Sequence, residues 1–246
     1  MAESPNRPAH PLDAPEAAAG GSACGSLGHT PAASICAVPS RCVRCDEPLT
    51  TPLVCGSCRT VFPAANEYDH FARFGLPRTM EIDERDLERR YLMLSRGLHP
   101  DQFAVRGTED KLLAEQLSAH VNDAFSVLKD RFRRAEYLLE LEGGPQRAQE
   151  KRTPAGFLAE MLEVNEQIEE ARGALDDSAR KQMASLRAEI TKRRDAFLAE
   201  VAQAFASLPA QGDLRRPGVL LKIRERLNAC AYLEGLSVQI REMLVS

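Results

Sequence analysis

The chain has no tryptophan, and aromatic residues make up only 5% of its 246 residues. With hydrophobic residues at 43%, this composition can fill two small cores but not a large aromatic one, which favours modest helical domains. No apolar run approaches the roughly 18–20 residues that a membrane-spanning helix requires. The sequence therefore contains no candidate membrane span.

The chain also lacks a basic excess. Its 32 Lys and Arg residues against 36 Asp and Glu residues leave a net charge of −4. Because a basic surface supplies most of the affinity for nucleic acid, this balance argues against general nucleic-acid binding. A catalytic set is missing as well, since no nucleophile, glycine-rich phosphate loop or oxyanion donor accompanies the pair His99 and Asp101. We therefore expect a binding protein and not an enzyme.

Large apolar side chains are almost absent from residues 1–40, which are rich in Ala, Pro, Gly and Ser. Such a segment cannot bury enough surface to offset the entropy of ordering, so it is predicted to be a disordered tail. It has neither the apolar core of a secretory signal nor the arginine-rich, acid-poor pattern of a transit peptide, which predicts a cytoplasmic protein. Cys24 and Cys36 have no knuckle spacing and are expected to be unstructured thiols.

Four cysteines within residues 41–63 have the spacing of a small zinc ribbon. They form two Cys-x-x-Cys pairs, Cys42 with Cys45 and Cys55 with Cys58. Two such turns aim four thiolates at one point, and a tetrahedral thiolate shell suits a structural zinc ion. Because so short a segment has no core of its own, metal binding would supply its folding energy. Disulfides, which a reducing cytoplasm disfavours, and a four-cysteine iron–sulfur or redox site remain the alternatives.

A basic amphipathic helix is predicted to follow, with Asp83 as its N-cap. Its apolar residues fall in one stripe at helical spacing, namely Leu87, Tyr91, Leu94 and Leu98. Its basic residues cluster on the opposite face, namely Arg85, Arg89 and Arg96. Pro100 cannot continue the helix and disfavours helical geometry at His99, so His99 and Asp101 are expected in a loop at the helix end. This arrangement is typical of a docking surface.

Three segments of the chain resemble one family. The tripeptide His99-Pro100-Asp101, between two amphipathic helices, is similar to the signature of a J-domain. Upstream, residues 71–77 (FARFGLP) resemble the opening of the HscB (Jac-type) iron–sulfur co-chaperones. Downstream, residues 122–125 (NDAF) and 134–139 (RAEYLL) resemble the third helix of that family and its exit. The resemblance covers residues 69–246.

This resemblance implies a J-domain at residues 69–142 that docks on a DnaK/HscA-class ATPase chaperone and stimulates its ATP turnover. The docking surface would consist of the tripeptide and the basic helix face, namely His99, Pro100, Asp101, Arg85, Arg89 and Arg96. Some relatives, notably eukaryotic ones, carry a four-cysteine knuckle ahead of the J-domain, whereas many bacterial relatives lack it. Two positions depart from the family pattern: Gln102 replaces the usual Lys beside the loop, and His70 replaces the usual Tyr.

Residues 153–246 predict an antiparallel three-helix bundle, reached through a linker at residues 143–152. Thr153 and Pro154 are typical of a helix start. Apolar residues repeat at helical spacing in three segments: Phe157, Met161, Val164, Ile168, Ala171 and Leu175; Met183, Leu186, Ile190, Phe197, Val201 and Leu208; and Leu220, Ile223, Leu227, Cys230, Ile240 and Leu244. Breaks at residues 176–178 and 209–212 favour a closed bundle over a generic coiled coil. The predicted fold is all-α: a zinc ribbon, a J-domain helical hairpin and the bundle.

One face of the first bundle helix, residues 155–172, is not needed for packing. Leu158 and Leu162 point roughly 100–140° away from Phe157. Acidic residues share their side of the helix, namely Glu163, Glu166 and Glu170. The resemblance implies that an IscU-type iron–sulfur scaffold protein docks here, with an aromatic contribution from Tyr232. Two alternatives stay open: a J-domain protein with a different client, and a zinc ribbon that binds nucleic acid, which nearby acidic residues disfavour.

Overall fold

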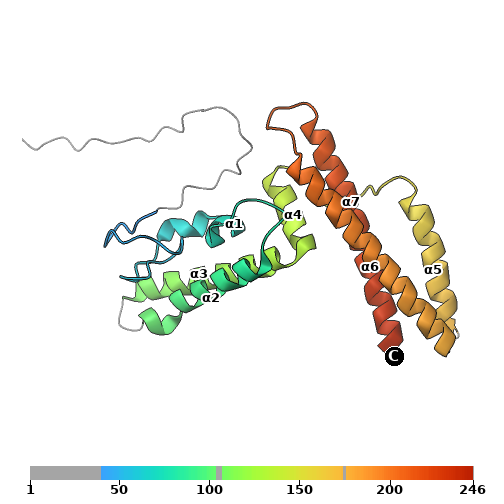
Figure 1. The fold of residues 1–246 in the computed structure, drawn as a ribbon, viewed down its shortest axis with the longest axis horizontal. Coiled ribbons are helices and arrows are strands. Elements are labelled where there is room, and N and C mark those ends of the chain that lie inside the picture. Colours follow the sequence, from blue (N-terminus) through green and yellow to red (C-terminus); the bar gives the residue numbers. More distant parts are fainter. Residues whose placement is uncertain (1–39, 104–106, 174–175, 246) are drawn as a thin grey trace, which may run out of the picture. The chain divides into compact units, whose positions relative to one another are not determined.

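The computed structural model describes residues 40–103, 107–173 and 176–245. Within these ranges the protein has seven α-helices, two 3-10 helices and no strand, which confirms the all-α prediction. The elements in chain order are η1 (Pro63–Glu67), α1 (His70–Phe74), α2 (Glu84–Gly97), η2 (Pro100–Phe103), α3 (Thr108–Lys129), α4 (Arg131–Leu141), α5 (Phe157–Gly173), α6 (Asp177–Ala206) and α7 (Arg216–Val245) (Figure 1). No described helix is long and apolar enough to cross a membrane. Cys24, Cys36, Leu175 and nearly all of the predicted tail lie outside the described residues.

The predicted hairpin is formed by α2 and α3, with α1 packed against both helices. Asp83 caps α2 as predicted, because its side chain accepts hydrogen bonds from two backbone N–H groups of the first turn. The predicted apolar stripe contributes three buried residues, namely Leu87, Leu94 and Leu98. Tyr91 stacks on Phe125 of α3, with ring centroids 4.1 Å apart. The face of α2 opposite this stripe is therefore free of the hairpin core.

The segment after α3 forms a helix of its own, α4. Asp130 ends α3 and caps α4, accepting a hydrogen bond from the backbone N–H of Arg133 at 2.8 Å. Arg134 is 2% exposed, and it donates to the backbone carbonyls of Leu128 and Met80. This buried guanidinium fixes the turn between α3 and α4.

Helix α4 also packs on α6 and α7. Arg224 of α7 is 1% exposed and donates from both Nη atoms to the carboxylate of Glu136 on α4. Asn228, one turn further along α7, donates to the backbone carbonyls of Glu150 and Arg152. One hydrophobic core runs from the cysteine region through α1 to α4 and into α6 and α7. The predicted linker is thus bound to α7 by side-chain hydrogen bonds.

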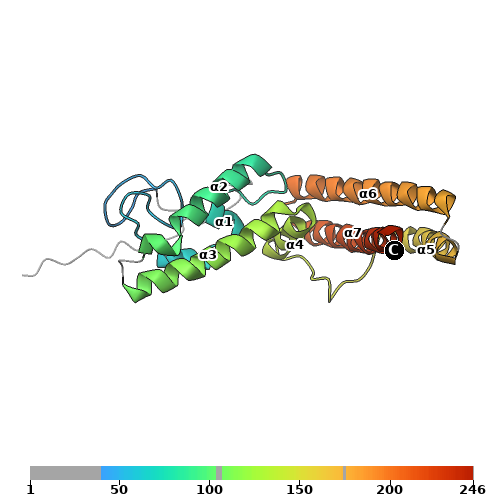
Figure 2. The same ribbon diagram turned by 90° about the horizontal axis from the view of Figure 1, so that it is seen from below.

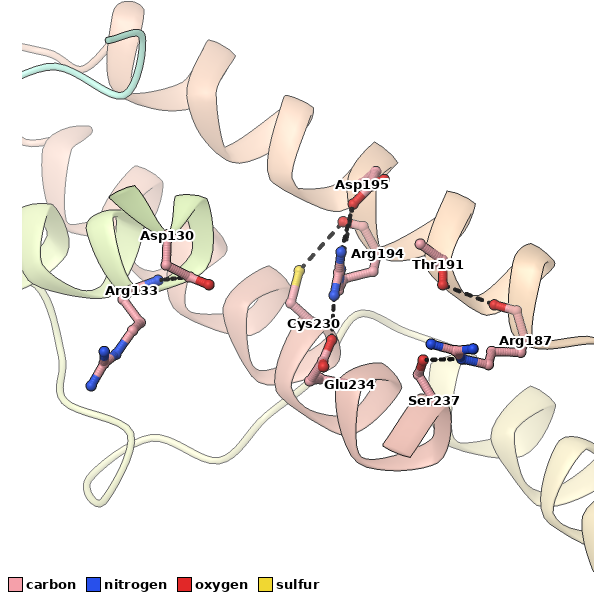
Figure 3. Close-up of polar contacts among 9 residues, drawn as sticks. All are labelled: Asp130, Arg133, Arg187, Thr191, Arg194, Asp195, Cys230, Glu234 and Ser237. Carbon is pink, nitrogen blue, oxygen red and sulfur yellow. Dashed lines mark hydrogen bonds and ion pairs between the residues drawn. The ribbon is translucent and has the colours of Figure 1, made fainter. Parts of the chain in front are cut away.

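The two long helices α6 and α7 lie side by side, with the shorter α5 against one end of the pair (Figures 1 and 2). Polar contacts join the middle of α6 to α7 (Figure 3). Arg194 pairs with Glu234, and the Arg187 Nε donates to the Ser237 hydroxyl at 3.3 Å. The Cys230 thiol donates to the Arg194 carbonyl at 3.7 Å, and burial raises its pKa to about 12. Cys230 is therefore an inert core thiol, as its position in the apolar stripe predicted.

The predicted start of α5 at Thr153 and Pro154 is wrong. The helix begins at Phe157, because Gly156 has a φ of 78°, a left-handed conformation that interrupts a right-handed helix. The predicted stripes of α5, α6 and α7 are otherwise buried or partly buried. The apolar residues buried in addition are Leu198, Ala229, Leu233, Leu236 and Met243.

Candidate metal centre and docking surfaces

The four predicted metal ligands meet at one point. The Sγ atoms of Cys42, Cys45, Cys55 and Cys58 all lie within 4.8 Å of one another. The Cys42–Cys58 and Cys45–Cys55 sulfur separations are 3.6 Å and 3.7 Å. A tetrahedral shell with zinc–sulfur bonds of about 2.3 Å has edges of about 3.8 Å, so the cradle fits a four-coordinate ion. Both separations are far too long for a disulfide, which needs about 2.05 Å.

The two cysteine knuckles have the same backbone geometry. In the first, the Asp46 N–H donates to the Cys42 carbonyl, and in the second the Arg59 N–H donates to the Cys55 carbonyl. Asp46 and Arg59 have φ values of 56° and 57°, which are uncommon for residues other than glycine. An isolated bridge closes each knuckle. Four thiolates would fill a tetrahedral shell, which leaves no open position for a substrate.

Hydrogen bonds within the cysteine cluster perturb the thiols. The Thr60 hydroxyl lies 3.1 Å from the Cys58 Sγ and lowers the pKa of that thiol to about 6. The pKa of Cys45 rises to about 12: a hydrogen bond with the Glu47 backbone opposes the rise, while desolvation and the neighbouring thiols cause it. A cation bound at the centre would favour the deprotonated form of these thiols, because metal binding requires thiolates.

The predicted docking tripeptide lies between two buried anchors. Leu98 and Phe103 are fully buried on either side of it. The side chains of His99 and Asp101 are 58% and 86% exposed. Pro100 opens the short helix η2, in which the Asp101 N–H donates to His99 Nδ1 at 3.3 Å. The tripeptide is thus presented to solvent on a firmly attached turn.

The three predicted basic residues of α2 are all exposed, namely Arg85, Arg89 and Arg96. Arg89 pairs with Asp86, and its hydrogen bond lowers the pKa of that carboxyl. Arg85 and Arg96 have no ion-pair partner within the described part of the chain. A fourth arginine, Arg90, makes a hydrogen bond within the hairpin, since its Nη1 donates to the Phe74 carbonyl at 2.9 Å. Of the three, Arg96 is in the last turn of α2 and is nearest in sequence to the tripeptide, whereas Arg85 is in the first turn.

The predicted client face of α5 is exposed. Leu158 and Leu162 are 61% and 62% exposed, while Phe157 and Met161 on the other side of the helix are buried. The predicted acidic residues are exposed too, namely Glu163, Glu166 and Glu170. None of these three glutamates has an ion-pair partner among the described residues, so the leucines have uncompensated negative charge around them.

Tyr232 of α7 is brought to this face by a residue that the sequence reasoning missed. Asn165 is in the same helical row as Leu158, seven positions further along the chain. Its Nδ2 donates to the Tyr232 hydroxyl at 2.8 Å and to the Met161 carbonyl at 2.7 Å. The Tyr232 ring, from a residue 38% exposed, packs edge-on against Phe157 with centroids 5.8 Å apart. The i, i+7 spacing was the available signal for Asn165.

The two positions that depart from the family pattern have different surroundings. Gln102 is exposed in η2, and its N–H donates to the His99 carbonyl at 2.9 Å. His70 stacks on Tyr137 with ring centroids 4.1 Å apart, and burial lowers its pKa. His70 is therefore a packing residue, whereas Gln102 leaves an uncharged side chain at the edge of the docking turn.

Comparisons with known proteins identify the family to which the chain is similar. Residues 153–241 match the family described as the HSCB C-terminal oligomerisation domain. A co-chaperone HscB homologue of Vibrio cholerae is 32% identical over 164 residues, which cover 65% of this chain and 94% of the relative. The solved HscB structure from Vibrio cholerae matches with a TM-score of 0.58 at 27% identity, covering 71% of this chain and 96% of that chain. The human HscB crystal structure matches with a TM-score of 0.62 at 26% identity, covering 82% and 97%. The chain belongs to the HscB family of co-chaperones.

Proposed function

We propose that this protein brings an IscU-type iron–sulfur scaffold to a DnaK/HscA-class chaperone and stimulates the ATPase of that chaperone. In this proposal residues 69–142 are the J-domain that docks on the chaperone, and residues 153–246 are the module that binds the scaffold. The membership of the HscB family and the resemblance to iron–sulfur co-chaperones support both assignments. The protein acts by binding, in the cytoplasm, and not as an enzyme.

The observation that carries the proposal is the display of His99-Pro100-Asp101 at the end of a basic helix face. The exposed side chains of His99 and Asp101 can reach a partner, while the buried Leu98 and Phe103 hold the turn in place. The neighbouring arginines of α2 favour an acidic chaperone surface, and such peripheral charges mainly raise the association rate.

Replacing His99 with Gln tests the chaperone half of the proposal. The fold should be unchanged, because this side chain is exposed, but stimulation in a single-turnover ATPase assay should be lost. Arg147→Gln, at an exposed position between α4 and α5, is the matched control and should stimulate normally. Normal stimulation by His99→Gln would contradict the assigned role of the tripeptide.

We further propose zinc as the metal of the four-cysteine centre and a structural role for it. Zinc prefers a tetrahedral shell of thiolates, and the sulfur separations match that shell. Metal analysis of the purified protein should return about one zinc per chain. A brown protein that contains iron would refute this assignment and favour a cluster bound by the same cysteines.

A further inference from the structure

A groove lies on the surface between the second cysteine knuckle and the last turns of α2. Its volume is about 640 Å³, and its walls come from the second knuckle, from the last turns of α2 and from the docking turn. Leu92 and Met93 of α2, which are 52% and 43% exposed, form its apolar side. His99 lines the same groove. The groove is therefore continuous with the proposed chaperone-docking surface.

The knuckle wall of the groove is firmly attached to α2. Val54 is 2% exposed and belongs to the same hydrophobic core as Leu94 and Leu98. A Cβ atom added to Gly97 would lie only 2.9 Å from Val54 Cγ1, so a larger residue at this position would require Val54 to shift. The second knuckle is thus part of the surface around the docking turn.

The groove is positively charged, which favours an acidic ligand. No acidic residue lines it, whereas Arg59 of the knuckle and Arg96 of α2 both do. Neither arginine has an ion-pair partner in the part of the chain that the structure describes. Arg96 also faces the negative end of the α2 dipole, being in the last turn of the helix. Arg59 therefore adds a second positive charge to the groove, besides the one that Arg96 of α2 supplies.

We propose that the second knuckle and α2 together form a composite docking groove for an acidic and apolar segment of the ATPase chaperone. This inference rests on the proposed function, because it assumes that the chaperone docks at His99. The groove's exposed Leu92 and Met93 would bury apolar side chains of that segment, while Arg59 and Arg96 pair with its carboxylates. The knuckle then serves partner recognition in addition to metal binding.

Charge reversal at Arg59 tests the groove in the full-length protein. Arg59→Asp keeps a residue type that tolerates the positive φ of this position. Arg44→Asp is the matched control, because Arg44 is an exposed residue of the first knuckle that does not line the groove. Each variant is titrated into the purified DnaK/HscA-class chaperone in the single-turnover ATPase assay, and bound metal is measured in the same samples.

For Arg59→Asp we expect the half-maximal concentration to rise about tenfold at low salt and less at high salt, with unchanged maximal stimulation and metal content. Arg44→Asp should behave as the wild type. If Arg59→Asp disturbs the metal, Arg59→Asn, which only removes the charge, should show a smaller rise with the metal intact.

Three results would overturn the groove while leaving the proposed function in place. Arg59→Asp and Arg59→Asn could both match the wild type, or Arg44→Asp could lose as much as Arg59→Asp, which would indicate a diffuse charge effect. Alternatively, Arg59→Asp could dock more tightly, which would indicate that the positive charge of Arg59 opposes docking. A wild-type protein that fails to stimulate the chaperone would instead refute the proposed function itself.

Discussion

Replacing Leu158 and Leu162 together by Ala should weaken scaffold binding without affecting the fold. Each change removes three carbon atoms, and about 0.8 kcal/mol is expected for each buried CH₂ group. About three-fifths of each side chain is free to become buried on docking, since the two leucines are 61% and 62% exposed. This gives roughly 1.5 kcal/mol for each leucine, and about 2–3 kcal/mol for the pair after imperfect burial is allowed for.

The assay is isothermal titration calorimetry with a purified IscU-type scaffold. A loss of about 2–3 kcal/mol corresponds to a Kd increased about 30- to 150-fold. The free energy of unfolding should change by less than about 0.5 kcal/mol, because these side chains contribute little to the core and Ala is a strong helix former. Basal stimulation of the chaperone ATPase should be unchanged.

The matched control is the double replacement of Leu112 and Leu214 by Ala. These leucines are also exposed, at 54% and 97%, but they lie outside α5. The control should bind the scaffold as the wild type does. Unchanged affinity of the α5 variant, or its unfolding in circular dichroism, would refute the assignment of this face as the scaffold site.

Two further predictions concern the metal and the pH dependence of stability. Cys58→Ser should lose the bound zinc in metal analysis while the helical content persists. Cys230→Ala, which changes a cysteine outside the cluster, should retain the metal. Retention of zinc by Cys58→Ser would exclude Cys58 as a ligand. Because burial holds the pKa of His70 below its ordinary value of 6.5, the unfolded state binds this proton more readily, and the free energy of unfolding should fall as the pH drops below 6.5. His70→Phe should reduce that fall in urea unfolding at several pH values, and an unchanged pH slope would contradict this origin.

The predictable parts of the fold were those that depend on local sequence. The helical spacing of apolar residues identified the core stripes of α2, α5, α6 and α7, because helical periodicity alone decides which face can be buried. The Asp83 cap was predictable for the same reason, since a cap acts within its own first turn. The paired Cys-x-x-Cys spacing predicted one cluster of four sulfur atoms. The structure places these atoms within 4.8 Å of one another.

The errors came from tertiary contacts. Thr153 and Pro154 have the local chemistry of a helix start, yet Asn228 of α7 holds the preceding carbonyls of Glu150 and Arg152 and the chain turns at Gly156 before α5 begins. The buried Arg134 is another such case, because its partners Leu128 and Met80 are set by folding and not by sequence spacing. The closeness of Val54 to Gly97, on which the composite groove depends, has no sequence signal either.

The central claim is that one molecule of this protein joins two partners, and an ATPase assay with mixed variants tests it most directly. The scaffold is titrated into the chaperone, and the half-maximal scaffold concentration for ATPase stimulation is measured. The titration is repeated with the wild-type chain, with His99→Gln, with the Leu158→Ala/Leu162→Ala variant and with an equimolar mixture of both variants. The account predicts that only the wild type lowers the half-maximal scaffold concentration, because each variant retains one docking site and the mixture has no molecule with both. A mixture that matches the wild type would contradict bridging and indicate two independent activities.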